Sequence, residues 1–597
     1  MRSSKPAQQI AISAAIIFIL YLIFQHADFG YDFHWAILYE VNPTYKEIFG
    51  YWLLKGLVLT VEISLISAVI ALILGTIFGI ARLSQFKPVY YFSTAYVEFF
   101  RNTPLLVQLF FWYFAFPLVL PDPLVEFFNE HHFEFWAATF GLSIYTASFV
   151  AEIVRAGIQA ISHGHLEAAF SSGLSWYQTL RFVILPQAFR IIIPPLGSEF
   201  LNNMKNSSLA MTIGVAELCW QSQQIESFTF RGFEATSAAS IIYLSLSLAI
   251  SLVMNSINHH LQVGQDRKLS LFDRALFALF NPFVLMGKSV TSVLAWGRKA
   301  FGKVKSESPS ENSVYLSPWS RFIALLSKGV VYGWKSLFVV FFAGLVALVG
   351  LIIFKFNWHV IWKSIPSLLF WTFPHGGKGE IFFGLGGLSL SILLAGISLF
   401  VSFFIGLVCG LGRLSKNTLL STTSILYIEI IRGNPLIMVI FWVYFFSPIL
   451  TGMQIDVFWS ATIAFTIFSG AYLAEIVRAG VSAIPEGQIE ASKASGLNYF
   501  QTMRCVVLPQ ALKLMIPAFV GQFIALFKDT SLAYIIGVFE LTTIAQTLNN
   551  RLMIYPFEIY TTIAVLYFIC CYSMSMVARH LEIKYSPDRR VETPRMA

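Results

Sequence analysis

The amino-acid sequence predicts an all-α, polytopic membrane protein with about twelve transmembrane helices in two parallel repeats. Apolar residues make up 56% of the 597-residue chain, charged residues only 12%, and the mean hydropathy is +0.69. This composition is far from that of soluble globular domains. A polar stretch set between apolar runs also occurs twice, as EAAFSSGLSWYQTLRFVILPQ (167–187) and EASKASGLNYFQTMRCVVLPQ (490–510). The duplication predicts two copies of one structural unit.

The apolar runs are long enough to cross a membrane, because about 20 mainly apolar residues in a helix span roughly 30 Å of hydrocarbon. In the first half we expect spans near residues 10–24, 57–81, 97–116, 136–153, 191–213 and 238–258. In the second half we expect them near residues 336–354, 385–411, 421–446, 458–476, 514–536 and 559–578. Equivalent spans are six apart, an even number, so both repeats face the same way around a pseudo-two-fold axis.

Basic residues flank the spans and do not form a separate basic domain, so the formal net charge of +8 indicates orientation and no nucleic-acid partner. Residues 115–135 carry four acids and no Lys or Arg, whereas residues 259–321 carry nine basic residues. The positive-inside rule therefore places both termini and both copies of the repeated stretch in the cytoplasm. Lys355, Lys363 and Lys378 oppose this orientation, which puts them outside.

The repeated stretch predicts two short helices joined by a tight turn. Gly173 suits the left-handed conformation that ends a helix. Ser175 and Gln178 then match a capping box, and the second copy keeps the pattern as Asn498 and Gln501.

The far boundary of this elbow is expected at Pro186 and Pro509. Apolar residues such as Leu174, Trp176 and Tyr177 are expected to be exposed on the elbow, which indicates a docking partner. The alternative for a single copy is an interfacial helix pair that only covers the bundle, but a symmetric pair favours a two-fold partner.

Three further motifs occur in the same order in both halves. They are RNTP (101–104) and RGNP (432–435), AEIVRAG (151–157 and 474–480), and KNSSLA (205–210) and KDTSLA (528–533). Together with EAAxxxG and its VILP or VVLP ending, they resemble ABC importer permeases of the polar amino acid uptake family, similar to histidine and glutamate/aspartate permeases. The resemblance covers about residues 57–260 and 383–585. Departures from the family pattern are Ser492 in place of the second Ala and HGHLEAA in place of PEGQIEA.

The resemblance implies a type I ABC importer fold in which two permease units, usually separate chains, are fused. Its implied domains are an N-terminal anchor and outer segment (1–56), a first permease domain (57–260), a cytoplasmic linker with an extra transmembrane helix and outer segment (261–382), a second permease domain (383–585) and a cytoplasmic tail (586–597). Residues 271–287 of the linker are expected to be interfacial or re-entrant.

The same resemblance implies that each elbow is an EAA loop that enters a groove on an ABC ATPase subunit. The coupling residues it implies are Glu167, Ala168, Gly173, Pro186, Glu490, Ala491, Gly496 and Pro509. Implied partners are two ATPase subunits forming a homodimer, an extracytoplasmic solute-binding protein, a polar amino acid and membrane lipid. ATP and Mg²⁺ would be bound by the ATPase subunits, with no cofactor or metal on this chain, and the location would be the bacterial inner membrane.

Polar residues in two equivalent apolar spans are candidates for a substrate pathway, since charge within a membrane is costly and often functional. These candidates are Glu199, Lys205, Asn206, Ser207, Gln522, Lys528, Asp529 and Thr530. A lysine could bind an amino acid carboxylate, or it could pair locally or snorkel to a helix end. Glu98 and Glu429 precede Arg101 and Arg432 by three residues, a spacing that predicts ion pairs.

The sequence predicts no catalytic residues. GKS (287–289) ends like a phosphate loop, but Pro282 occupies the position where that loop requires Gly, so ATP hydrolysis is expected on another chain. An alternative is a secondary transporter of the major facilitator type, which also has two six-helix halves. That class has no need of paired elbows. A membrane-embedded enzyme or scaffold is disfavoured because no catalytic constellation is present.

Overall fold

The computed structural model describes residues 31–261, 349–372 and 385–585, with shorter helical stretches between residues 8 and 19 and between residues 336 and 347. The described chain is helical apart from one antiparallel pair of two-residue strands, β1 (Trp371–Thr372) and β2 (Leu385–Gly386). Trp371 pairs with Gly386 and Thr372 with Leu385. The predicted linker helix at 271–287 lies outside the described residues, and of the predicted N-terminal span at 10–24 the structure describes residues 11–16 and 18–19, which are helical.

The first repeat consists of a long helix, a broken helix, and three further long helices with shorter ones between them. Its elements are η1 (Trp35–Leu38), α2 (Phe49–Ala81), α3 (Lys87–Arg101), α4 (Leu105–Phe110), η2 (Phe111–Ala115), η3 (Phe116–Val119), α5 (Asp122–Glu130), α6 (Phe133–Gln159), α7 (His163–Ser171), α8 (Trp176–Thr179), η4 (Leu180–Ile184), α9 (Leu185–Asn206), η5 (Ser207–Ile213), α10 (Leu218–Thr229) and α11 (Gly232–Leu261).

The second repeat follows the same order, preceded by an apolar helix at Phe338–Lys355. Its elements are α15 (Trp358–Leu369), α16 (Leu388–Arg413), α17 (Thr418–Gly433), α18 (Leu436–Thr451), α19 (Val457–Ser482), α20 (Glu486–Ala494), α21 (Tyr499–Thr502), η6 (Met503–Val507), α22 (Leu508–Asp529), η7 (Thr530–Ile536), α23 (Leu541–Leu552) and α24 (Pro556–Tyr585). Helix α5 is the one long insertion by which the described part of the first repeat exceeds the second.

Two predicted spans are broken, which corrects the expectation of continuous helices at 97–116 and 421–446. Helix α3 and the α4 segment meet at 106°, and α17 and α18 meet at 110°. Each break falls at the RNTP or RGNP motif, because Pro104 and Pro435 disfavour helical conformation in the preceding residue and cannot donate a backbone hydrogen bond. The described residues contain nine helices long and apolar enough to span a membrane, or up to eleven if each bent pair is one span.

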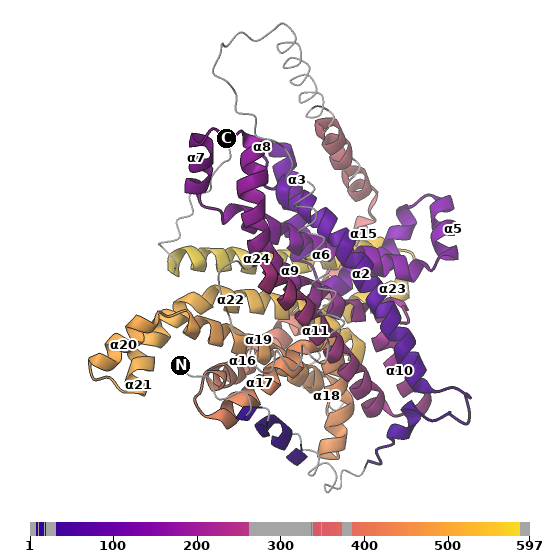
Figure 1. Cartoon of the computed structure of the whole chain (residues 1–597). Helices are drawn as coiled ribbons and strands as arrows, with labels where there is room; N and C mark the ends of the chain where they lie inside the picture. The colour runs from indigo at the N-terminus through magenta and orange to yellow at the C-terminus, as the bar shows by residue number, and fades with distance from the viewer. Residues whose placement is uncertain are drawn as a thin grey trace.

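Small residues let the first span of each repeat lie directly against the third. On α2, a Cβ added at Gly75 would lie 2.5 Å from Val150 Cβ of α6. On α16, a Cβ added at Gly406 would lie 2.5 Å from Leu473 Cβ of α19. Glycine at these contacts lets the two helix backbones approach closely. Close approach gives membrane helices the van der Waals packing that holds them together. Figure 1 shows α2 and α6 crossing near the centre of the molecule.

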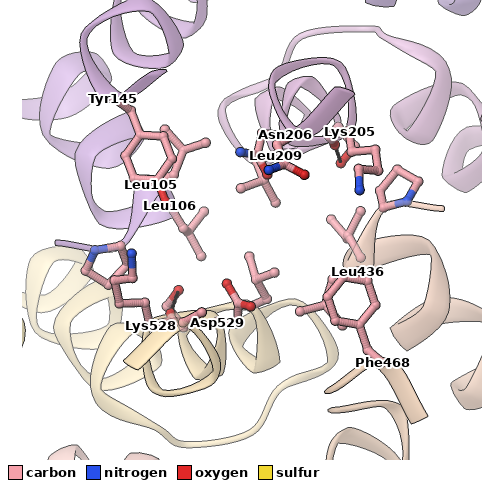
Figure 2. Close-up of a pocket in the computed structure, with 18 of the residues that line it drawn as sticks. Leu105, Leu106, Tyr145, Lys205, Asn206, Leu209, Leu436, Phe468, Lys528 and Asp529 are labelled. Atoms are coloured by element: carbon pink, nitrogen blue, oxygen red, sulfur yellow. Dashed lines mark hydrogen bonds between the residues drawn. The ribbon is translucent and has the colours of Figure 1, made fainter. Parts of the chain in front are cut away.

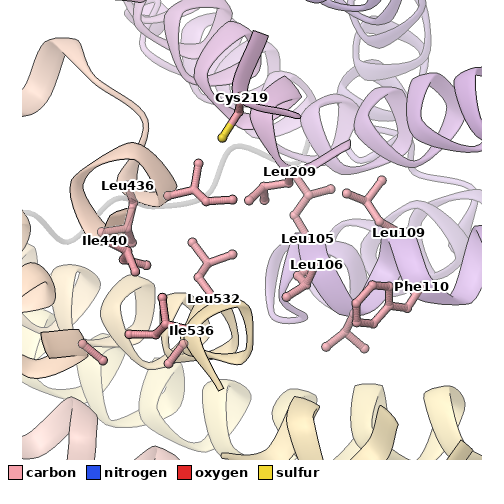
Figure 3. Packing of buried hydrophobic residues seen from close by; sticks show 14 of the residues in the cluster. Leu105, Leu106, Leu109, Phe110, Leu209, Cys219, Leu436, Ile440, Leu532 and Ile536 are labelled. Carbon is pink, nitrogen blue, oxygen red and sulfur yellow. The ribbon is translucent and has the colours of Figure 1, made fainter. Parts of the chain in front are cut away.

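The repeats meet along a shared apolar core. In Figure 3, Leu105, Leu106 and Leu209 of the first repeat face Leu436 and Leu532 of the second. The last span of each repeat packs on the broken helix of the other, α11 against α18 and α24 against α4. This crossed packing makes the two repeats one unit.

Ion pairs join three helices at the same end of each repeat. Arg82 contacts Glu152 at 2.6 Å and Glu98 at 3.5 Å. In the second repeat, Arg413 contacts Glu475 at 3.1 Å and Glu429 at 3.2 Å. These contacts overturn the prediction that Glu98 and Glu429 pair within their own helices.

The two arginines that were expected to form those pairs lie over aromatic rings of the third span. The Arg101 guanidinium is 5.4 Å from the centre of the Phe149 ring, and that of Arg432 is 5.2 Å from the Tyr472 ring. The spacing of three residues within each helix would allow an ion pair. Glu98 and Glu429 instead form ion pairs with Arg82 and Arg413, which come from the preceding span.

Candidate functional site

The two elbows end their first helix in the same left-handed turn. Gly173 has a φ of +79° and Gly496 a φ of +80°. Leu174 N donates to Ala169 O at 3.1 Å, and Leu497 N donates to Ser492 O at 3.1 Å. These bonds satisfy carbonyls that the helix end leaves free. The prediction of a left-handed glycine at each elbow is confirmed.

A capping box then starts the second helix of each elbow, as the sequence predicts. Ser175 N donates to Gln178 Oε1 at 2.8 Å, and Gln178 N donates to Ser175 Oγ at 3.3 Å. In the second copy, Asn498 N donates to Gln501 Oε1 and Gln501 N donates to Asn498 Oδ1, both at 2.9 Å. Each elbow is therefore fixed by its own local hydrogen bonds.

The far boundary differs from the prediction. Helices α8 and α21 continue through the π-helical turns η4 and η6 into α9 and α22. Pro186 and Pro509 lie in the first turn of those long helices, where a missing N–H is tolerated. A π-turn displaces the hydrogen-bond ladder by one residue and so accommodates the proline without ending the helix. Each elbow is thus continuous with the span that follows it.

Both elbows lie at the periphery, at the ends of long helices (Figure 1). Seven of the eight predicted coupling residues are exposed, and Pro186 is half-buried; the seven are Glu167, Ala168, Gly173, Glu490, Ala491, Gly496 and Pro509. Apolar rings are also exposed there, 47% for Phe170 and 70% for both Tyr499 and Phe500. Leu174 is half-buried, and the Trp176 and Tyr177 side chains lie outside what the structure describes.

The Ser492 departure has a local structural explanation. Ser492 is buried, donates to Ile489 O at 2.7 Å and lies 3.0 Å from Thr502 Oγ1 in a hydrogen bond. The first elbow has Ala169 and Thr179 at these positions, and the buried Thr179 Oγ1 has no hydrogen-bond partner. Serine therefore adds two internal hydrogen bonds to the second elbow, while the turn keeps the same left-handed glycine.

A cavity of about 220 Å³ lies between the repeats, a little below the usual size range of small-molecule sites. Equivalent elements of both repeats line it: the two helix breaks, α6 and α19, and the ends of α9 and α22. In Figure 2, Lys205 and Asn206 face Lys528 and Asp529 across the opening. The cavity wall is thus built by the pseudo-two-fold relation of the repeats.

Six of the eight predicted pathway residues line this cavity: Glu199, Lys205, Asn206, Gln522, Lys528 and Asp529. Ser207 and Thr530 do not line it, because they are buried and donate to Met204 O and Phe527 O. Their neighbours Ser208 and Ser531 line it in their place. The helix tightens to a 3₁₀ form at η5 and η7, and this form puts residues three apart on one face, so Ser208 follows Lys205.

Sequence reasoning also missed lining residues that come from other spans, including Asn202, Asn434, Tyr145 and Tyr472. Only their polar character within apolar runs could have indicated them.

The cavity is polar but asymmetric. Glu199 in the first repeat corresponds to Gln522 in the second, and Asn206 corresponds to Asp529. Each repeat therefore contributes one carboxylate. The two carboxylates lie at non-equivalent positions along α9 and α22. Two lysines and two carboxylates balance in formal charge, which suits a zwitterionic ligand better than a bare ion.

Comparison with known proteins identifies the family. Residues 71–263 and 402–586 each match the family model described as binding-protein-dependent transport system inner membrane component. The chain belongs to this family. It is a permease component of such a transport system and carries two permease units in one polypeptide. The secondary-transporter alternative receives no support from these matches.

Individual relatives match about one unit of this permease. The glutamate/aspartate import permease protein GltJ of Escherichia coli (strain K12) is 33% identical over 236 residues, which cover 39% of this chain and 96% of the relative. The probable glutamine ABC transporter permease protein GlnP of Bacillus subtilis (strain 168) is 42% identical over 200 residues, covering 33% of this chain and 91% of the relative.

Two solved structures are also similar to one unit. An amino acid ABC transporter crystallised with histidines has 32% sequence identity, covers 35% of this chain and 94% of its own, and has a TM-score of 0.32. The inward-facing MetNI methionine ABC transporter has 25% identity, covers 33% of this chain and 93% of its own, and has a TM-score of 0.30.

Proposed function

We propose that this permease imports polar amino acids, with the cavity between its repeats as the translocation pathway and the two elbows as its coupling to ATP hydrolysis. The observation that carries the proposal is the paired arrangement. Two elbows of the same shape are continuous with α9 and α22, and these two helices end at the cavity wall. Relatives named as glutamate/aspartate and glutamine permeases support polar amino acids as the substrate class.

The partners follow from this arrangement. Two elbows of nearly identical backbone call for two identical grooves, so the proposed ATPase partner is a homodimer of ABC subunits. ATP and Mg²⁺ are bound there, and the permease contributes no catalytic residue. The elbows, both termini and the ATPases lie on the cytoplasmic side of a bacterial inner membrane, and a solute-binding protein docks on the opposite side.

Within the pathway, Glu199 and Asp529 are proposed to meet the ammonium group of the substrate, and Asn206 and Gln522 to donate hydrogen bonds. Glu199 is 9% exposed and lines the cavity, and no ion pair to it is found among the described residues. A carboxylate buried within a membrane span is costly and often serves a ligand.

Uptake of labelled amino acids tests the proposal. Cells with and without this chain are given a panel of acidic, amidic and basic amino acids, after ATP depletion or after collapse of the proton gradient. We expect uptake of at least one polar amino acid that requires the chain and ATP. Uptake that survives ATP depletion but needs the proton gradient would refute ATP-driven import.

A further inference from the structure

The two cavity lysines reach across to the opposite repeat. Lys205 Nζ of α9 donates to Arg432 O at 3.1 Å and to Tyr472 OH at 3.2 Å. Lys528 Nζ of α22 donates to Arg101 O at 2.9 Å. These are equivalent contacts, each joining the end of one repeat's fourth long span to the other repeat.

The acceptor carbonyls lie where the bent helices break. Arg101 is the last residue of α3, and Arg432 is in the last turn of α17. Carbonyls at a helix C-terminus lack intrahelical donors and carry a partial negative charge, so a cation is a favourable cap there. Pro104 and Pro435, each three residues on, then turn the chain into the cavity wall.

The surroundings of Lys528 make its hydrogen bond costly to lose. Lys528 is 9% exposed and lies 5.5 Å from the Phe149 ring centre and 5.8 Å from that of Tyr145. A buried ammonium that loses its hydrogen-bond acceptor bears the full cost of desolvation. Lys528 is therefore most stable when it keeps its hydrogen bond to Arg101 O. This bond holds α22 next to the break after α3.

The same helices begin at the elbows. The segment Leu180–Ile213 runs without interruption from the first elbow past Lys205, and Tyr499–Ile536 runs from the second elbow past Lys528. A displacement of either elbow along its helix therefore reaches a lysine that is bonded to the opposite repeat. Each elbow is therefore connected, through the helix and lysine of its own repeat, to the cavity wall of the other repeat.

We infer that Lys205 and Lys528 are positioning residues that couple each elbow to the bent helix pair of the opposite repeat, so that movement of the elbows reshapes the cavity. The inference rests on the proposed function and adds a role to residues considered above only as pathway lining. It also explains why both repeats keep a lysine while the neighbouring acid alternates between Glu199 and Asp529.

The test uses the whole importer, with its ATPases and binding protein, in proteoliposomes where uptake and ATP hydrolysis are measured on one preparation. The variants are Lys205→Met, Lys528→Met, the double variant and the Lys→Arg replacements. We expect the double variant to transport about tenfold fewer amino acids per ATP, since a hydrogen bond made by a charged group is lost at each site. The KM for the amino acid should stay unchanged, and arginine should restore much of the ratio.

A control variant separates coupling from the mere loss of a lysine. Lys363→Met removes an exposed lysine of α15 that lies outside the cavity, and it should change neither quantity.

A raised KM with an unchanged ratio of uptake to hydrolysis would overturn the inference, since it would make the lysines substrate contacts. Absence of ATP-dependent uptake in the parent protein would instead refute the proposed function, so the two failures are distinguishable. Hydrogen exchange on the parent importer gives a second test that needs no variant. Amides following Arg101 and Arg432 should change protection when ATP binds, and no change there would contradict the coupling.

Discussion

The turn glycine of each elbow offers a clean perturbation, because its substitution changes the backbone energy and little else. Gly173 and Gly496 have positive φ angles, and a Cβ added at either would meet no atom within 4 Å. Gly173→Ala and Gly496→Ala therefore introduce no clash. The cost is that of a left-handed L-residue, about 1–2 kcal/mol. At about 1.4 kcal/mol per tenfold change, the native turn becomes roughly 5- to 30-fold less populated relative to alternatives.

Each elbow also contains its own control. Gly164 in α7 and Gly487 in α20 are exposed, have open space around the added Cβ and lack a positive φ. Alanine at these helical positions should stabilise the elbow by about 0.5–1 kcal/mol. A matched pair in one elbow thus separates turn geometry from the mere addition of a methyl group.

The assay is hydrogen exchange at the Leu174 and Leu497 amides, together with ATP-driven uptake. Both amides close the turn, so exchange should accelerate in Gly173→Ala and Gly496→Ala and slow or stay constant in Gly164→Ala and Gly487→Ala. Uptake should fall only in the first pair. Equal behaviour of the turn and control variants would refute the argument that the left-handed turn sets the docking shape.

Three other perturbations probe stability. Ser492→Ala should destabilise the second elbow by about 1–3 kcal/mol, because buried Thr502 Oγ1 loses its side-chain partner. Ala169→Ser in the first elbow should be neutral or stabilising. Limited proteolysis of each elbow measures both effects. Gly79→Ile should separate α2 from α6, since its Cβ would lie 2.7 Å from a backbone carbonyl oxygen, and thermal aggregation of purified protein should begin several degrees lower. Glu217→Ala should cost about 1–3 kcal/mol, because a buried carboxylate that caps α10 and accepts from a tyrosine hydroxyl is removed; detergent-resistance assays measure this.

The features that the sequence predicts well are those determined locally. The elbows depend on a glycine for φ and on capping partners three residues away, and both lie within one short stretch. The number and order of spans follow from apolar length, and the repeat shows which elements are equivalent.

The features that it predicts poorly depend on tertiary neighbours. The sequence predicted that Glu98 would pair with Arg101 of its own helix, but Glu98 pairs with Arg82, which follows the preceding span. The bends at Pro104 and Pro435 were hidden because the flanking residues are apolar on both sides. The partners of Lys205 and Lys528 lie more than two hundred residues away along the chain, and no local pattern indicates them.

The central claim is that one polypeptide forms a whole permease pair, and the mass of the purified importer tests it most directly. Native mass spectrometry of the complex with its ATPases should give one copy of this chain and two ATPase copies. A complex with two copies of this chain and two ATPases, each chain using one elbow, would contradict the claim.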